Sequence, residues 1–266
     1  FRTVNMKTTV IDFHSHVGRM GNYNIYDDQD WYVKTLDDAG VDKCFVSYIF
    51  DGKAKNCNDI VYEFVQKNPK RFGGFAHVNP HYIDEAIPEL DRAFNKLGMK
   101  ALKIYPPFAD YPVNHESWYP IFEWCNENKI PIKSHTQYGP GEFRHDYGGR
   151  PILFIDLAQK FPDVNWILAH SGNFELGRIE SVKAAQECPN IYLETCSSYG
   201  DHGTIEYFVD SLGDERVLYG SDVPLIDPRF GVGRIVTANI TTESKRKILG
   251  LNALKVLNLK ESEVIG

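Results

Sequence analysis

The chain has 266 residues, a length that suits one large domain or two small ones. Hydrophobic residues make up 42% and charged residues 24%, which is ordinary for a soluble globular protein. The net charge of −7 argues against binding to nucleic acid and to an anionic membrane surface.

Cysteine usage and the lack of long apolar segments bear on the cellular compartment. The five cysteines are dispersed and form no CxxC motif, which predicts reduced thiols of a cytosolic protein and no disulfide framework. No run of about 18 apolar residues occurs, and no basic region followed by an apolar stretch opens the chain. We therefore expect a cytoplasmic protein without a transmembrane helix or signal peptide.

Apolar, strand-like runs alternate with amphipathic stretches along the chain. The clearest helical spacing occurs at residues 58–67, 83–97, 118–128, 151–160 and 205–212. Buried strands are expected at residues 10–14, 43–49, 72–77, 101–105, 130–135, 164–170, 191–195 and 217–220.

This alternation predicts an α/β protein with a parallel sheet. Eight strand–helix units within about 250 residues match the size of a (β/α)₈ TIM barrel. A doubly wound open sheet is the rival, but it calls for a glycine-rich phosphate loop after the first strand. Here the first strand ends in histidines instead, and no linker or repeat interrupts the chain. We expect residues 1–266 to form a single barrel domain.

Ligand-type side chains end four of the predicted strands. His14 and His16 lie two residues apart at the end of the first strand, so both point to the same face. His135, His170 and Asp222 end the fifth, sixth and eighth strands. In a barrel these ends meet at one mouth. Imidazoles and a carboxylate converging there predict a metal site.

The same residues carry a resemblance to a known family. The chain resembles the amidohydrolase superfamily, in the amidohydrolase-related branch that includes aminocarboxymuconate-semialdehyde decarboxylase. The resemblance implies a metal-dependent enzyme on a (β/α)₈ barrel, usually with zinc. The matching motifs are residues 11–16, 132–135, 167–172, 216–224 and 247–253.

The resemblance also implies a role for each group. His14, His16 and His135 would be metal ligands, Asp222 a ligand or proton acceptor, and His170 a catalytic acid or base. One divalent metal, with zinc as the expected ion, would leave room for a water whose pKa falls to around 7.

Asp12 lies on the same strand face as His14. It is either a carboxylate that holds a ligand imidazole or a buried structural group.

Lys103 in the fourth predicted strand has three interpretations. In binuclear relatives a carboxylated lysine on strand four bridges two metals. The alternatives are an ammonium that faces the substrate and an outward, solvated lysine.

Several further residues are candidates for binding the substrate. Arg19, Arg144 and Arg229 lie in loops after strand ends, where each would clamp a carboxylate or remain on the surface. Tyr105, with Phe108, Tyr111 and Trp118, follows the fourth strand and would wall a pocket or pack its own loop. His77, which ends the third strand, is either structural or substrate-lining, and Cys196 is interpreted as structural.

These features favour a metal-dependent hydrolase that acts on a small, anionic organic substrate through a metal-activated water. The alternative is a metal-dependent, non-oxidative decarboxylase that uses the same site. A catalytically silent binding protein is disfavoured, because it has no chemical reason to keep all five groups. We expect a small-molecule substrate and no nucleic-acid or membrane partner, and a homo-oligomer is compatible with the sequence.

Overall fold

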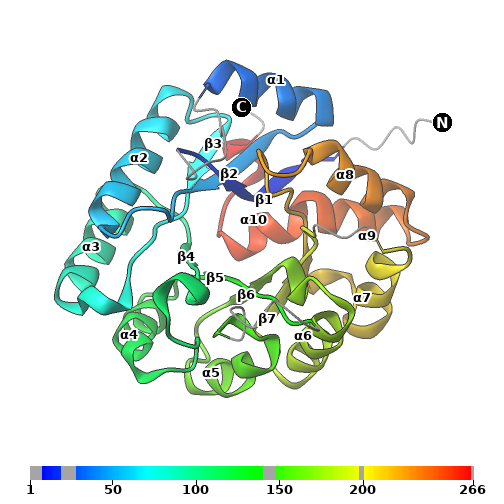
Figure 1. The fold of residues 1–266 in the computed structure, drawn as a ribbon. Coiled ribbons are helices and arrows are strands. Elements are labelled where there is room, and N and C mark those ends of the chain that lie inside the picture. Colours follow the sequence, from blue (N-terminus) through cyan, green and yellow to red (C-terminus); the bar gives the residue numbers. More distant parts are fainter. Residues whose placement is uncertain (1–7, 19–27, 140–147, 198–200, 265–266) are drawn as a thin grey trace.

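A computed structural model describes residues 8–18, 28–139, 148–197 and 201–264. Strands and helices alternate along this chain, and the strands surround a common axis (Figure 1). The strands are β1 (Ile11–His16), β2 (Lys43–Ser47), β3 (Phe72–Gly74), β4 (Leu102–Ile104), β5 (Ile132–His135), β6 (Trp166–Ala169), β7 (Ile191–Glu194) and β8 (Val217–Leu218).

The strands are parallel and close into a ring. Ladder hydrogen bonds join β1, β2 and β3 in one sheet and β4 through β8 in another. Parallel bridges from Ala76 to Leu102 and from Ser15 to Val223 connect the two sheets at both edges. Because β1 and β8 are neighbours, the expected (β/α)₈ barrel is confirmed and the open doubly wound sheet is excluded.

Most helices form an outer layer around the strands, whereas the last one lies over the middle of the ring in Figure 1. Local signals define their ends: at the first helix, Asp28 accepts hydrogen bonds from the backbone N–H groups of Asp30 and Trp31, and Gly40 at φ 71° ends it. The helices are α1 (Gln29–Ala39), α2 (Ala54–Lys67), α3 (Ile83–Asn95), α4 (Tyr119–Glu127), α5 (Phe154–Lys160), α6 (Glu175–Glu187), α7 (Thr204–Leu212), α8 (Pro228–Thr237), α9 (Thr242–Arg246) and α10 (Asn252–Val256).

Two differences from the expected elements have physical causes. Helix α6 was not among the clearest expected helices, because its buried face is made largely of small residues such as Gly177, Ser181 and Ala184. Strand β8 ends before the expected residue 220, because the N–H of Tyr219 bonds to the carbonyl of Ile248 instead of continuing the ladder.

The N-terminal end of the barrel is closed by its own apolar core. Phe75 packs within 5.1 Å of Phe45 and 4.9 Å of Phe13, measured between ring centroids. The C-terminal residues of the chain pack into the same cluster, which leaves the opposite end of the strands for chemistry. Those C-terminal residues are Ala253, Leu254, Val256, Leu257 and Val264.

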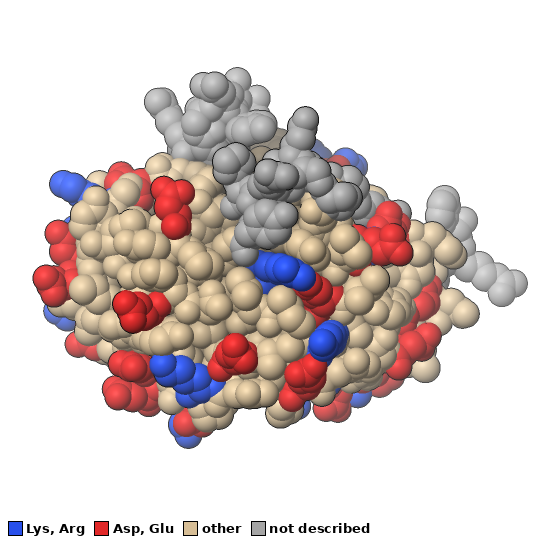
Figure 2. All heavy atoms as spheres, turned by 60° about the horizontal axis from the view of Figure 1, so that its bottom comes forward, with Lys and Arg blue, Asp and Glu red and all other residues tan. Residues whose placement is uncertain are grey.

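The remaining expectations from composition concern thiols, membranes and charge. All five cysteines are buried and none forms a disulfide, as expected. Within the described residues, no helix combines the length and apolarity needed to traverse a bilayer. On the face shown in Figure 2, acidic and basic side chains of the described residues are interspersed.

Candidate metal and active site

Strand β1 and the segment that follows β8 bring three ligand-type side chains together at the carboxyl end of the barrel, although β8 itself ends four residues before Asp222. A bulge shifts the pairing of β1 with β2 between Asp12 and Ser15, just where the histidines occur. Oδ1 of Asp222 lies 3.5 Å from Nε2 of His14 and 3.1 Å from Nε2 of His16. These three buried groups lie close enough together to hold one ion.

The distances and the unmet hydrogen bonds fit a divalent metal. Ligands about 2.0–2.1 Å from a tetrahedral ion lie roughly 3.3 Å from one another, close to the separations observed here. Nε2 of His14 and Oδ1 of Asp222 are buried without a hydrogen-bond partner among the described residues. Buried polar atoms are rarely left unpaired, so a cation accounts for both.

Glu194 orients the first of these ligands. Its Oε2 lies 2.9 Å from Nδ1 of His14, so that Nε2 keeps its lone pair for a metal. The backbone N–H groups of His170 and Cys196 bond to the same carboxylate. Sequence reasoning missed Glu194, although it ends β7 at the same level as the predicted ligands.

We expect Glu194→Gln to weaken metal binding by about 10–100-fold, because a neutral amide polarises the His14 imidazole less than a carboxylate. Competition with a chelating dye measures the metal affinity. Glu187→Gln, at the exposed end of α6, is the matched control and should bind metal like the wild type. Equal affinity in both variants would remove Glu194 from the metal site.

Asp12 serves the backbone and does not hold a ligand imidazole. Its Oδ1 accepts hydrogen bonds from the backbone N–H groups of His14 and Ser221, at 3.0 and 2.9 Å. The Ser221 hydroxyl bonds to its other oxygen. Of the two interpretations of Asp12, the buried structural carboxylate is therefore correct: it ties β1 to the segment after β8.

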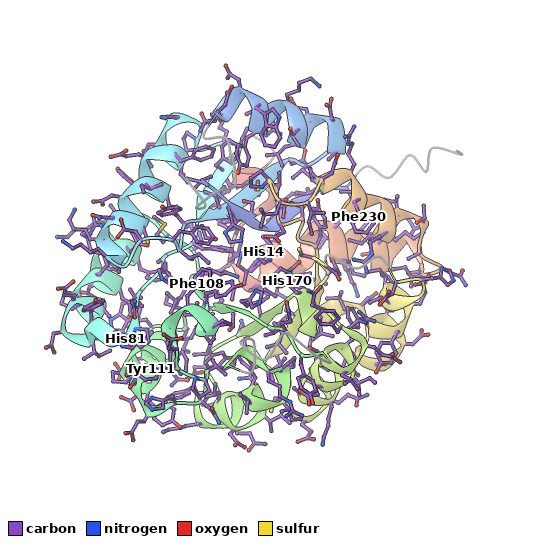
Figure 3. The ribbon with its side chains drawn as sticks, viewed as in Figure 1. His14, His81, Phe108, Tyr111, His170 and Phe230 are labelled. Atoms are coloured by element: carbon purple, nitrogen blue, oxygen red, sulfur yellow. The ribbon has the colours of Figure 1, made fainter. Side chains whose placement is uncertain are left out.

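His170 and His135 extend the cluster from β6 and β5. The centroid of the His170 ring is 4.8 Å from that of His14 and 4.8 Å from that of His135 (Figure 3 labels His14 and His170). Both ring nitrogens of His135 are buried and unpartnered among the described residues. His135 thus borders the site but is not within the tight group formed by His14, His16 and Asp222.

Cys196 also lies at this centre. Its sulfur is within 4.8 Å of ligand atoms of His14 and His170. Burial raises the pKa of the Cys196 thiol well above its usual value.

Unusual backbone conformations aim the site residues. His170 and Asp222 adopt positive φ angles of 66° and 68°, which non-glycine residues rarely do. A Cβ at Gly220 would lie 2.2 Å from Oε1 of Glu194, so this position requires glycine for the close approach. The N–H of Asp222 bonds to the carbonyl of His14 at 2.7 Å, which locks the two ligands in register.

Burial sets the protonation states of the ligands. It lowers the pKa of His14 well below the usual value, and the nearby Lys133 lowers it further. It likewise lowers the pKa of His135. Burial acts to raise the pKa of Asp222, but the close approach of His16 outweighs this effect and holds that pKa low. Neutral imidazoles and an ionised carboxylate are the states that bind metal.

A cavity of about 160 Å³ opens beside the ligands. An engineered cavity of about 150 Å³ holds a molecule the size of benzene. Tyr105, a predicted substrate-binding residue, lines it and stacks on His135 with ring centroids 4.2 Å apart. Its polar side includes His16, His135, His170 and Asp222, and its apolar side includes Phe50, Tyr105, Phe108 and Leu225.

A family model of the amidohydrolases matches residues 12–259, which include every site residue described above. The chain belongs to the amidohydrolase family. The match confirms the resemblance carried by the sequence motifs. It also agrees with the barrel and with chemistry at the carboxyl ends of its strands.

Two curated relatives of this amidohydrolase are named as decarboxylases. A 2-amino-3-carboxymuconate-6-semialdehyde decarboxylase of Dictyostelium discoideum is 24% identical over 244 residues, covering 80% of this chain and 68% of the relative. A gamma-resorcylate decarboxylase of Polaromonas is 22% identical over 297 aligned positions, covering 88% and 89%. These relatives favour the decarboxylase alternative over the hydrolase that the sequence analysis placed first.

Solved structures show the shared fold. A 5-carboxyvanillate decarboxylase of Sphingomonas paucimobilis superposes with a TM-score of 0.76 at 19% identity, covering 95% of this chain and all of that one. A dihydroxybenzoic acid decarboxylase of Polaromonas, solved with manganese and 2-nitroresorcinol, gives 0.77 at 18%, covering 97% and 100%. For this amidohydrolase, the grouping of His14, His16 and Asp222 supports a metal, and zinc in particular stays a prediction.

Two buried lysines lie near the ligands of this amidohydrolase. Lys103 on β4 is fully buried, so the outward, solvated interpretation is wrong. Its Nζ has no hydrogen-bond partner among the described residues, and burial together with Lys133 lowers its pKa to about 7. Lys133 on β5, missed by sequence reasoning, donates to the carbonyl of Phe13 at 3.0 Å.

Lys103→Met is expected to raise the free energy of unfolding of chelator-treated protein by about 1–4 kcal/mol near pH 7, because an unpaired buried ammonium is removed. The unfolded chain, with a lysine pKa of about 10.4, binds more protons than the folded wild type above pH 7. This lysine therefore makes the wild type more stable as the pH rises, and the difference in free energy of unfolding between Lys103→Met and the wild type should shrink towards about pH 10. Urea unfolding of both proteins between pH 7 and about pH 10 measures this difference.

Lys34→Met, at an exposed ion pair on α1, is the control and should show no such pH dependence. A Lys103→Met variant less stable than the wild type at pH 7 would contradict the assignment of an unfavourable buried charge.

Of the three predicted arginines, the structure describes only Arg229. The guanidinium of Arg229 is exposed and paired with Asp227 at the start of α8, so the structure does not bring it to the histidines. The carboxylate of Asp227, two residues away, pairs with the positive charge of Arg229. Arg19 and Arg144 lie outside the described residues.

Proposed function

We propose that this amidohydrolase catalyses the metal-dependent, non-oxidative decarboxylation of a small carboxylate. The observation that carries the proposal is the group of buried, unpartnered histidine and aspartate atoms beside a small cavity with aromatic walls. The relatives named as decarboxylases support this choice of reaction over hydrolysis.

The residues divide into a group that holds the metal and a group that serves the substrate. His14, His16 and Asp222 would hold the cation, and His135 would reach it from β5 as a further ligand. The bound divalent metal supplies positive charge that draws carboxylate and hydroxyl oxygens of the substrate into place. The aromatic residues Tyr105 and Phe50 enclose the substrate's unsaturated carbon frame and exclude water.

The reaction breaks one carbon–carbon bond and consumes one proton. Carbon dioxide leaves without the bonding electron pair, and the carbon that carried it retains the pair and takes up a proton. His170 relays this proton from water: it lines the cavity, and its Nδ1 has no partner among the described residues. Burial lowers the pKa of His170 to about 4, so the imidazole is neutral and takes up a proton at one ring nitrogen as it gives one up at the other. Electron-rich aromatic or conjugated carbon suits the reaction, because its π system can accept the proton first and then recover the electron pair of the carbon–carbon bond as carbon dioxide leaves. The substrate class is therefore a small unsaturated or aromatic carboxylate.

The test is a screen of metal-reconstituted protein in deuterium oxide. The panel contains 2,6-dihydroxybenzoate, 2-hydroxybenzoate and 5-carboxyvanillate, together with an aryl ester and a lactone. Release of carbon dioxide with one deuterium at the former carboxyl position is expected for at least one acid. A chelator should abolish turnover, and manganese or zinc should restore it.

Hydrolysis of the ester or lactone without decarboxylation of any acid would overturn the proposal in favour of the hydrolase. Turnover that survives complete metal removal would also overturn it.

A further inference from the structure

A second, larger cavity adjoins the cavity at the metal ligands. It measures about 380 Å³ and lies among the segments that follow β2, β3 and β4. Ile49, Phe50, Tyr105 and Phe108 line both cavities, so the two share one wall. Figure 3 places Phe108 beside the barrel centre occupied by His14 and His170, on the side of α3 and α4.

The shared wall consists of aromatic rings that hold one another. Phe108 stacks on Tyr105 with centroids 4.2 Å apart and meets Phe50 edge-on at 5.8 Å. The Phe108 side chain is 57% exposed, whereas aromatic side chains of the barrel core are fully buried. Phe108 is thus an exposed part of the wall between the two cavities, and a ligand that spans both would have to turn its ring aside.

The second cavity contains a hydrogen-bond acceptor of fixed tautomer. Nδ1 of His77 lies 2.9 Å from the carbonyl oxygen of Lys103, which can only accept, so Nδ1 carries the proton. Burial lowers the pKa of His77 to about 4, so the ring is neutral at pH 7. Nε2 of His77 therefore presents a lone pair, and no described residue donates to it.

The same cavity is poor in positive charge. Among the described residues that line it there is no lysine or arginine, and Asp51 contributes a carboxylate. A second carboxylate of a substrate would be repelled here. The walls instead offer apolar contact through Val78 and Ala109, and Trp118 has a buried indole N–H without a partner in the described chain.

We propose that the second cavity binds the uncharged, distal end of an elongated aromatic carboxylate whose terminal hydroxyl or amino group donates a hydrogen bond to Nε2 of His77. The inference rests on the proposed function, because it places the reacting carboxylate in the cavity at the metal ligands. The first cavity has the size of one ring, and the second fits the 300–1,000 Å³ range typical of ligand sites.

Three acids test this assignment: 2-hydroxybenzoate, its 4-phenyl derivative and its 4-(4-hydroxyphenyl) derivative. Calorimetry on metal-loaded and metal-free protein gives the dissociation constants, and carbon dioxide release gives kcat/KM. Wild type should bind both extended acids at least tenfold more tightly than 2-hydroxybenzoate. The hydroxylated acid should bind best, by a further fivefold to tenfold, because it adds one hydrogen bond.

Two variants test separately how the volume of the second cavity and its hydrogen-bond acceptor contribute to binding. Ala109→Leu fills the second cavity without touching the first and should reduce the preference for both extended acids about tenfold. His77→Phe keeps a ring but removes the acceptor, and should erase only the advantage of the hydroxylated acid. Ala54→Leu, at the start of α2 and outside both cavities, should keep every preference of the wild type.

The outcomes distinguish this inference from the proposed function. Equal binding of all three acids by the wild type, or an unchanged preference in both variants, overturns the second cavity as a substrate site, even if carbon dioxide is released. The expected preferences without any carbon dioxide release support the cavity assignment and overturn decarboxylation instead. Thermal unfolding of each variant verifies that it is folded.

Discussion

Asp222→Asn is expected to lose the metal and with it almost all turnover. Elemental analysis should fall from about one metal per chain in the wild type to near zero in the dialysed variant. The reason is the position of Oδ1, 3.5 and 3.1 Å from the two histidine nitrogens, where an anionic oxygen offsets the charge of a divalent cation. Asparagine keeps the shape of the side chain and removes its charge, so a loss of metal can be attributed to the missing negative charge.

Asp227→Asn is the matched control, because this carboxylate lies five residues further along and pairs with Arg229 at the surface. It should keep the wild-type metal content. An Asp222→Asn variant that still binds one metal at wild-type affinity would refute the ligand assignment. About two metals per wild-type chain would instead favour the carboxylated form of Lys103 as a bridge.

The barrel and the convergence of its ligands could be predicted from the sequence for one physical reason. Parallel strands place their carboxyl ends on one side, so any residue that ends a strand approaches the others. His14, His16 and Asp222 meet in this way across the closure between β1 and β8. The closure itself follows from eight alternating units, which the pattern of apolar runs reveals.

Other parts of the site could not be read from the sequence, because they depend on which way a side chain points. Glu194 ends a strand like the predicted ligands, but only the fold shows its carboxylate against His14. Lys133 occurs within a recognised motif, and only the alternation of β5 shows that it faces the barrel interior. The sequence allows Asp12 to be either a carboxylate that holds a ligand imidazole or a buried structural group, and only the fold shows its oxygen bonded to the backbone N–H groups of His14 and Ser221.

The choice between hydrolysis and decarboxylation cannot be predicted from the ligand residues. The ligand set determines where an oxygen of the substrate binds, but it does not determine which bond breaks. That depends on what the cavity holds next to His170 and on the walls built by Phe50 and Phe108. Those walls come from loops, whose sequences carry no readable motif, so the relatives and the cavity shape contribute what the motifs lack.

His170→Asn is expected to keep the metal but lower kcat by about 10²–10⁴-fold, because it removes the imidazole proposed to deliver the proton. Asparagine tolerates the φ of 66° at this position better than most residues. The backbone N–H of residue 170 still bonds to Oε2 of Glu194, so the support of His14 remains. Steady-state kinetics and elemental analysis of the same preparation measure both quantities.

Two further variants show whether the loss of activity is specific to the imidazole of His170. His202→Asn, at an exposed position before α7, should match the wild type in metal content and kcat. His14→Ala should lose metal and activity together, because it removes a ligand. If His170→Asn loses metal to the same extent as His14→Ala, then the imidazole of His170 is itself a ligand. Its position 4.8 Å from the rings of both His14 and His135 would then mark a metal centre displaced towards β6, and the proton would have to come from another group.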